Sequence, residues 1–168
     1  MAQHDLESPG GAVKNTVAGQ SAEALVIPDA PKPAGRYVPY VISRGLVYIS
    51  GQTARVDGKI AYAGMVGRDL SLEEGQLAAR ICAINVLSQL KAACGNDFGR
   101  VARCVRLGGF VCSAPDFYQQ PDVLNGASDV ILAALGDAGE HVRTAVGVAA
   151  LPSNSAVEVD AVFELRNP

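Results

Sequence analysis

The sequence predicts an α+β domain in which two helices lie on one face of a mixed β-sheet. Segments with strand-like alternation of apolar and polar residues come first, and two long helix-like segments then alternate with further strands. The order is strands, helix, strand, helix, strand, strand. A chain of 168 residues, 49% of them hydrophobic, is long enough to bury one core, so we expect a single folded domain.

Composition argues against several classes of function. The formal net charge of -3, with dispersed Lys and Arg, gives no basic surface for nucleic acid. The four cysteines lack paired C-x-x-C spacing and only two histidines are present, so we expect buried, reduced thiols and no metal site. No segment has the pattern of a signal peptide or of a membrane span. We therefore expect a soluble cytoplasmic protein with no membrane or nucleic-acid partner.

The beginning of the chain differs in character from the rest. Residues 1–34 mix Gly, Ser, Ala and Pro without a sustained period, which predicts a flexible N-terminal arm before a folded body over 35–168. The body opens with YVPYVISRGLVYISG, which indicates two strands around a Ser-Arg-Gly turn. A second hairpin is predicted within ARVDGKIAYAG, because Asp57-Gly58 is typical of a two-residue hairpin turn.

The first helix is predicted from its capping signals. Ser71 followed by Glu74 has the spacing of a capping box, in which each side chain bonds the other residue's backbone amide. The helix is expected to run to about Cys94, with Gly95 as its stop. Its apolar residues occupy more than one side, which indicates burial on more than one side.

A strand and a second helix are expected next. VARCVRLGGFVC, residues 101–112, is predicted to be a strand with a glycine pair that marks a bulge or a close backbone approach. The second helix is expected from about Asp116 or Gln120 to Leu135, and Gly136 ends it.

The last 25 or so residues indicate two strands joined by a Pro-Ser-Asn-Ser turn, which predicts a terminal hairpin. In the final strand the apolar residues share one face and the acidic residues share the other. The first set is Val157, Val159, Ala161 and Phe163, and the second is Glu158, Asp160 and Glu164. We expect the apolar face to meet the helices and the acidic face to look toward solvent or another subunit.

Arg143 lies near the start of this hairpin, within a run of small and apolar residues. A loop over 151–155 would place Arg143 opposite Glu164 and Ala149 opposite Glu158. Arg143 and Glu158 would then lie about 20 Å apart in one chain, so a pocket holding both would have to form between subunits. The pattern leaves two interpretations of Arg143 open, an interface or edge salt bridge and a clamp for a carboxylate ligand.

Four short motifs occur in order along the folded body. They are G-x-Y-V at 35–38, Ile-Ser-Gly-Gln at 49–52, Val-x-Asn at 123–125, and R-x-x-V-x-V-x-x-L-P followed by V-E-V-D-A within 143–161. Together they resemble the Rid (reactive intermediate deaminase, also called YjgF) family over residues 35–165. The resemblance implies a chorismate-mutase-like, bacillus-type fold assembled as a homotrimer with pockets at the subunit interfaces. It also implies hydrolysis of small enamine or imine carboxylates to keto compounds and ammonia, with no metal or organic cofactor.

The same resemblance implies roles for individual residues. Arg143 matches the arginine that holds the substrate carboxylate, and Glu158 matches the acid near the attacking water. Tyr37, Ser50 and Asn125 match polar residues that line the pocket. These roles are chemically consistent, because a carboxylate can accept the proton of the water while a fixed substrate makes the attack effectively intramolecular.

One position departs from the family pattern. Ala145 stands where deaminases of this family often have a cysteine, which makes the pocket wider or less polar there and admits a larger unsaturated amino acid such as an aminomuconate. His141, two residues before Arg143, is a further candidate for the pocket, and a surface position is its alternative.

The pattern alone also allows structural roles for the matched residues. Tyr37 could be a core aromatic, Ser50 a turn hydroxyl, Asn125 a helix-start residue and Glu158 a solvated strand residue. Ser50 has no partnering histidine in the sequence pattern, so it is not predicted to be a triad nucleophile.

Other functions remain as alternatives to deamination. The same pocket could belong to a non-catalytic, ligand-binding or regulatory protein. A ribonuclease fits poorly with the acidic composition and the absence of a catalytic histidine pair. A chorismate mutase would rest on fold analogy alone, and a fold does not carry a function.

Overall fold

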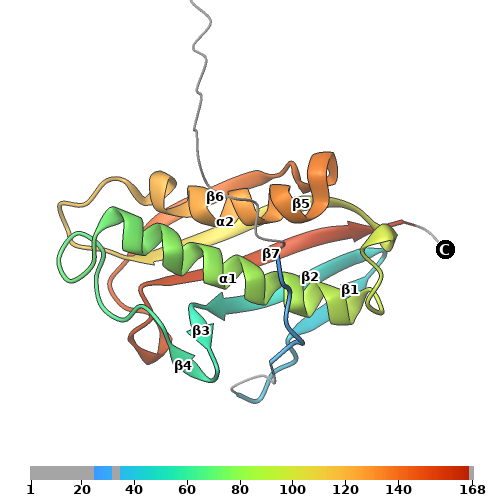
Figure 1. Ribbon diagram of the computed structural model, residues 1–168, viewed down its shortest axis with the longest axis horizontal. Helices are drawn as coiled ribbons and strands as arrows, with labels where there is room; N and C mark the ends of the chain where they lie inside the picture. Colours follow the sequence, from blue (N-terminus) through green and yellow to red (C-terminus); the bar gives the residue numbers. More distant parts are fainter. Residues whose placement is uncertain (1–24, 32–34, 167–168) are drawn as a thin grey trace, which may run out of the picture.

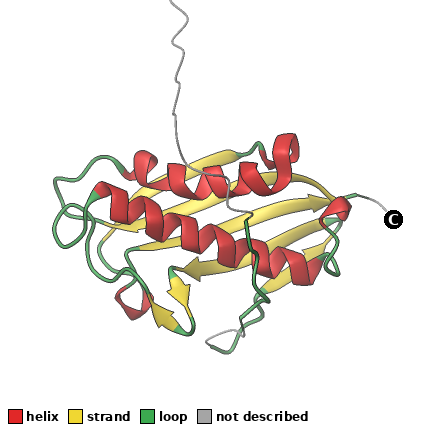
Figure 2. Ribbon diagram, viewed as in Figure 1, coloured by secondary structure: helices red, strands yellow, loops and turns green. Residues whose placement is uncertain are grey.

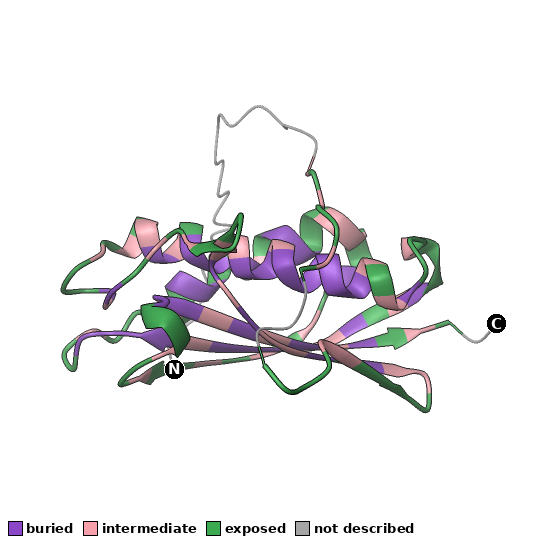
Figure 3. Cartoon of the chain, turned by 90° about the horizontal axis from the view of Figure 1, so that it is seen from below, coloured by how far each residue is buried: buried purple, intermediate pink, exposed green. Residues whose placement is uncertain are grey.

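A computed structural model describes residues 25–31 and 35–166 of the chain, and it forms two layers (Figure 1, Figure 2). The strands are β1 (Tyr40–Ser43), β2 (Leu46–Thr53), β3 (Arg55–Val56), β4 (Lys59–Ile60), β5 (Val101–Cys112), β6 (Val142–Val148) and β7 (Val157–Leu165), and the helices are α1 (Leu72–Ala93) and α2 (Gln120–Leu135). A five-stranded sheet has the order β1-β2-β7-β5-β6, and β3 and β4 form a separate ribbon. Both helices lie on one face of the larger sheet (Figure 3), which confirms the predicted fold class.

Both predicted hairpin turns are present. Arg44 and Gly45 connect β1 to β2 with φ values of 50° and 80°, and Asp57 and Gly58 connect β3 to β4 with 49° and 77°. Two consecutive positive φ values give the turn the twist that neighbouring strands require. The Gly at the second position of each turn adopts this conformation without steric cost.

The two helices end as their sequences predict. Ser71 Oγ accepts from the Glu74 amide at 3.2 Å and the Ser71 amide donates to Glu74 Oε2 at 2.8 Å, which confirms the capping box of α1. Gly95 follows α1 with a φ of 70°, and Gly136 caps α2 with a φ of 58°. Glycine suits both positions because a Cβ disfavours positive φ.

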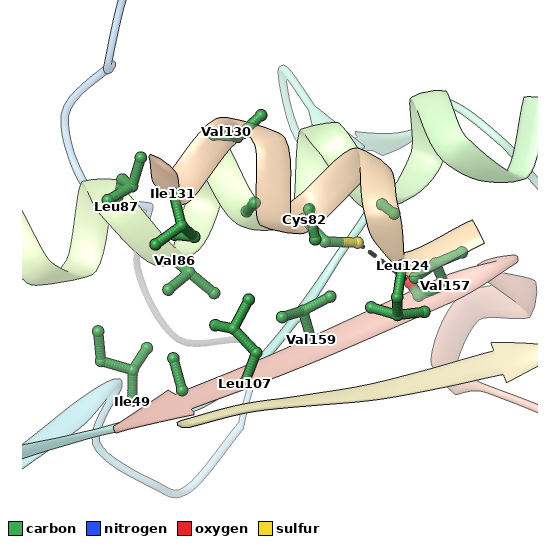
Figure 4. Packing of buried hydrophobic residues seen from close by; sticks show 14 of the residues in the cluster. Ile49, Cys82, Val86, Leu87, Leu107, Leu124, Val130, Ile131, Val157 and Val159 are labelled. Atoms are coloured by element: carbon green, nitrogen blue, oxygen red, sulfur yellow. Dashed lines mark hydrogen bonds between the residues drawn. The ribbon is translucent and has the colours of Figure 1, made fainter. Parts of the chain in front are cut away.

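The core lies between the helices and the sheet. Val157, Val159 and Phe163 are fully buried on the helix-facing side of β7, which confirms that the apolar face of this strand meets the helices. Figure 4 shows Val157 and Val159 beneath the helices, with the Cys82 thiol donating to the Val157 carbonyl at 3.3 Å. All four cysteines are buried and free, as predicted.

The predicted terminal hairpin is wrong, because β5 lies between β6 and β7. β6 pairs with β5 in parallel, and β7 pairs with the other edge of β5 in antiparallel fashion. The helix α2 carries the chain from the end of β5 back to its beginning, so β6 starts at the same end as β5 and runs along its free edge. Alternation of residue types reports which face of a strand is buried and not which strand is its neighbour. The register that set Arg143 opposite Glu164 and Ala149 opposite Glu158 is therefore wrong too.

The predicted N-terminal arm lies largely outside the described residues, which omit 1–24 and 32–34. Residues 25–31 run along α1. Lys91 Nζ donates to the Ile27 carbonyl at 3.4 Å and to Asp29 Oδ1 at 3.2 Å, and Gln89 Nε2 donates to the Pro31 carbonyl at 3.0 Å. The flexibility of the arm stays a prediction.

Among the helices that the structure describes, none has the length and apolar character needed to span a bilayer.

Candidate functional site

Glu158 and Tyr37 line the same cavity, which has a volume of about 150 Å³. The cavity lies where β2 and β7 meet the end of the first hairpin. The residues with polar side chains that line it include Tyr37, Gln52, Thr53, Arg55, Asn85 and Glu158. A larger hollow of about 740 Å³ lies between residues 26–31 and the β3–β4 ribbon, and none of the predicted site residues lines it.

The Glu158 carboxylate lies against the backbone of Gly51. A Cβ placed on Gly51 would be 2.8 Å from Glu158 Cδ, so any other residue at this position would displace the carboxylate. The pairing of β2 with β7 shifts register between Ile49 and Gln52, which forms a bulge at this point. Burial raises the pKa of Glu158, and the negative charge of Asp160 raises it further.

Ser50 acts on the backbone beside the cavity. Its hydroxyl donates to the Val38 carbonyl at 3.0 Å, and its amide donates to the Pro39 carbonyl at 3.0 Å. These bonds fix the segment that follows Tyr37, whose side chain is half exposed at the cavity. Ser50 is not among the residues that line this cavity in one chain, so its predicted place in a pocket between subunits stays a prediction.

Arg143 lies on the edge strand β6 and reaches toward α2. Its Nη1 donates to Asn125 Oδ1 at 3.1 Å and to Ser128 Oγ at 2.9 Å. Its Nη2 donates to the Pro121 carbonyl at 3.0 Å. Within the described residues Arg143 forms no ion pair, so the salt-bridge interpretation finds no support in one chain. Of the five N–H donors of a guanidinium, one on Nε and one on Nη2 are left for a ligand.

His141 and Ala145 lie near Arg143. Alternate residues of a strand point to the same face, so Arg143 and Ala145 share the face of β6 that looks toward the helices. His141 bonds Ser128 and the Gly139 carbonyl, so it meets Arg143 through Ser128. Ala145 is half-buried, packs against the core, and pairs with Gly109 on β5. Ala145 thus adds only a methyl group to the face of β6 that carries Arg143.

The predicted site residues therefore fall into two groups in one chain. Arg143 pairs with Leu107 of β5 and points toward the helices, whereas Glu158 pairs with Phe110 on the other side of β5 and lies on the opposite face. The two pairs are three residues apart along β5, or about 10 Å. Arg143 and Glu158 therefore do not point toward one another within a single chain. The predicted separation of about 20 Å loses its basis with the hairpin, and the pocket between subunits stays a prediction.

Sequence reasoning missed two residues that hold the site. Asn85 of α1 is almost completely buried, and its Nδ2 donates to the carbonyls of Thr53 at 3.1 Å and Arg55 at 3.0 Å, which fixes the end of β2 beside the cavity. Ser128 bonds Arg143 and His141. The spacing of Asn125 and Ser128 could have indicated a shared helix face, because residues three apart are neighbours on a helix.

No metal site appears in the part of the chain that the structure describes, where no three His, Cys, Asp or Glu side chains gather.

Comparison with known proteins places the chain in a family. Residues 18–165 match the family model described as "YjgF/chorismate_mutase-like, putative endoribonuclease". Protein TCP17 of Trypanosoma cruzi is 49% identical over 144 residues, which cover 85% of this chain and 89% of that protein. The Lactococcus lactis protein named "Putative regulator AldR" is 30% identical over 141 residues, which cover 83% and 94%.

A solved structure shares the fold and much of the sequence. The crystal structure of Atu1372 from Agrobacterium tumefaciens superimposes with a TM-score of 0.80 at 45% identity, and the match covers 85% of this chain and 87% of that one. The resemblance of the four motifs is thus confirmed over nearly the whole described fold. The chain belongs to the YjgF/chorismate-mutase-like family.

Proposed function

We propose that this protein hydrolyses small enamine or imine carboxylates to keto compounds and ammonia, in pockets that two copies of the chain complete together. The observation that carries the proposal is the division of the site in one chain. Arg143 has two N–H donors left for a ligand, and Glu158 lines a cavity to which Arg143 does not contribute. Arg143 can bind a carboxylate but cannot take a proton from water, whereas Glu158 can take the proton but cannot bind a carboxylate.

A cyclic homotrimer is the assembly that we propose to join the two groups. In a ring every interface is heterologous, so the edge formed by β6 and α2 of one chain can meet the Glu158 cavity of the next. The sheet face opposite the helices supports self-association. It carries exposed apolar side chains at Val41 (51%), Tyr48 (46%), Val142 (68%) and Val146 (40%), and such a patch is typical of a protein–protein contact.

The chemistry follows from the two groups. Arg143 binds the substrate carboxylate through parallel hydrogen bonds, and this holds the imine carbon near Glu158. An enamine first takes a proton on carbon to become the imine. Glu158 then accepts one proton of the water as the oxygen adds to the imine carbon, and the imine nitrogen takes up a proton to become an amine. The protonated Glu158 gives its proton to this amine, the carbon–nitrogen bond breaks, and the new hydroxyl loses its proton to solvent, which releases ammonia and leaves the keto acid.

The environment of Glu158 suits this task. Its raised pKa makes the carboxylate a stronger base than an exposed glutamate, so it accepts a proton from water more readily. Tyr37 and Gln52 line the cavity beside it and supply polar groups for the water and the nitrogen. The small Ala145 leaves room for a substrate larger than 2-aminoacrylate.

A ligand-binding protein without turnover is the second candidate. The name of the AldR relative, a regulator, favours it, and this relative matches 83% of the chain. Such a protein would keep the Arg143 clamp and would need no proton transfer by Glu158.

Ammonia release from 2-iminopropionate or 2-aminoacrylate generated in situ separates the two candidates. The proposal predicts acceleration over a no-enzyme control by wild type and loss of that acceleration in Arg143→Ala. Binding without turnover predicts no ammonia from either protein, but a carboxylate-induced rise in the melting temperature that Arg143→Ala abolishes. A series of larger enamine carboxylates, tested in the same way, shows whether the space beside Ala145 admits a larger substrate.

A further inference from the structure

The hydroxyl of Ser128 lies between Arg143 and His141. Ser128 belongs to α2, and Arg143 is the second residue of β6, which His141 immediately precedes. Figure 1 shows where these two elements lie. Arg143 Nη1 is 2.9 Å from Ser128 Oγ, and His141 Nε2 is 3.0 Å from the same oxygen. His141 Nδ1 is 2.6 Å from the Gly139 carbonyl oxygen. Three side-chain groups and one carbonyl thus form a continuous chain of hydrogen bonds.

The direction of each hydrogen bond follows from the groups involved. The Gly139 carbonyl can only accept, so His141 Nδ1 carries a proton. In the neutral imidazole Nε2 is then an acceptor, and the Ser128 hydroxyl donates to it. The oxygen of Ser128 keeps its lone pairs for the N–H of Arg143. Every proton in this series of hydrogen bonds has one acceptor, and the Ser128 hydroxyl cannot rotate without losing its bond to His141.

Close packing fixes the end of this series of hydrogen bonds that lies at Gly139. Gly139 is buried, and a Cβ placed on it would lie 2.7 Å from the Ile131 carbonyl oxygen and 3.0 Å from Leu132 Cα. The backbone at Gly139 therefore touches the backbone of α2, the helix that also carries Ser128. The segment whose carbonyl anchors His141 is thus packed against the helix that carries the Ser128 hydroxyl.

We propose that Ser128 and His141 are positioning residues that hold the Arg143 guanidinium in the orientation that binds the substrate carboxylate. This inference rests on the proposed function of Arg143 as a carboxylate clamp. An arginine side chain loses much rotamer freedom when it binds a ligand, and a side chain that is already held loses less. The contacts to Ser128, Asn125 and Pro121 use three donors and leave one N–H on Nε and one on Nη2 for the ligand.

The substitution Ser128→Ala tests this role. Alanine is the best helix former, so α2 is expected to stay folded. Loss of one hydrogen bond to a charged group predicts that KM for 2-iminopropionate rises about tenfold, while kcat changes by less than about threefold. Ser128→Thr keeps a hydroxyl and is expected to retain most of the wild-type KM. His141→Phe removes the partner of Ser128 and is expected to raise KM in the same direction. Asp129→Ala, an exposed change one residue along α2, is the matched control with no expected effect.

A second readout does not depend on activity. NMR signals of the Arg143 guanidinium, identified by their absence in Arg143→Lys, report how freely the Cζ–Nη bonds rotate. We expect slow rotation in wild type, Ser128→Thr and Asp129→Ala, and fast rotation in Ser128→Ala and His141→Phe.

The two readouts separate failure of this inference from failure of the proposed function. If wild type releases no ammonia from 2-iminopropionate or from the larger enamine carboxylates, while the guanidinium signals depend on Ser128, the deaminase function is wrong and the positioning role stands. If wild type releases ammonia and Ser128→Ala changes neither KM nor the signals, the positioning role is wrong. Covalent labelling of Ser128 by a fluorophosphonate would also overturn it, because a serine activated by histidine as a nucleophile reacts in this way.

Discussion

The side chain of Glu158 occupies the space that a side chain on Gly51 would need. A Cβ on Gly51 would lie 2.8 Å from Glu158 Cδ and 3.1 Å from its Cγ. Gly51 lies within the bulge of β2 between Ile49 and Gln52, so the backbone bends where the carboxylate lies against it. The Glu158 carboxylate, the proposed proton acceptor, can therefore occupy its position because residue 51 of the neighbouring strand is a glycine.

Gly51→Ala is expected to displace the Glu158 carboxylate with little loss of stability. The φ of Gly51 is outside the left-handed region, so alanine can adopt its backbone conformation, and the free energy of unfolding should change by no more than about 1 kcal/mol. A misplaced base predicts a fall in kcat of about tenfold or more. Gly99→Ala, which would also crowd only a side chain but far from the cavity, is the control. Unchanged kcat in Gly51→Ala would show that the placement of Glu158 is unimportant.

Asn85→Ala is expected to destabilise the fold beside the cavity. Asn85 Nδ2 bonds the carbonyls of Thr53 and Arg55, and its removal leaves both without this donor in a buried place. Unsatisfied buried groups predict a loss of about 1–3 kcal/mol in the free energy of unfolding, measurable by urea denaturation. Gln76→Ala is the control. Gln76 lies on the same helix, is partly exposed and bonds a single carbonyl, so a smaller loss of stability is expected. Equal losses in the two variants would contradict this account.

Asp69 gives a stability contribution that depends on pH. The hydrogen bond from Arg68 and that from the Met65 amide lower the pKa of Asp69 from 3.8 to about 2. The folded state thus favours the charged carboxylate, so its stabilising effect is complete above the unfolded pKa and is lost as pH falls through the folded pKa. We expect Asp69→Asn to be less stable than wild type at pH 7, with the difference shrinking between about pH 4 and pH 2. Because the pair with Arg68 is exposed, salt should also reduce the difference. A difference that stays constant from pH 7 to pH 2 would contradict this assignment.

Local signals in the sequence were sufficient for the elements whose ends they define. Ser71 and Glu74 fix the start of α1 through contacts three residues apart, and Asp57-Gly58 fixes the turn between β3 and β4 through its own φ values. Such features depend on neighbours in the chain. They could therefore be predicted without any knowledge of which elements pack together.

Pairing between distant strands could not be predicted in the same way. The alternation of β7 is the same whether its neighbour is β6 or β5, and only the crossover through α2 decides that β5 lies between them. The face that Arg143 occupies depends on this pairing, which is why its contacts with Asn125 and Ser128 were not predicted. The motifs predict the candidate site residues, whereas the faces on which Arg143 and Glu158 lie depend on the fold.

The proposed function requires that Arg143 of one chain and Glu158 of another act on the same substrate. Mixing inactive chains tests it directly. Arg143→Ala chains keep Glu158, and Glu158→Gln chains keep Arg143, so a mixed ring contains interfaces with both native residues. With random assembly of equal amounts, about one quarter of the interfaces carry both.

The measurement is ammonia release from 2-iminopropionate by the two variants, unfolded and refolded separately and together. A site shared between chains predicts negligible activity for each variant alone and about one quarter of the wild-type activity for the mixture. A mixture of Arg143→Ala with the double variant Arg143→Ala/Glu158→Gln, in which no chain carries Arg143, is the control and should stay inactive. If the first mixture stays inactive as well, while size measurements show that the chains have mixed in one oligomer, the two residues do not share a site and the account is wrong.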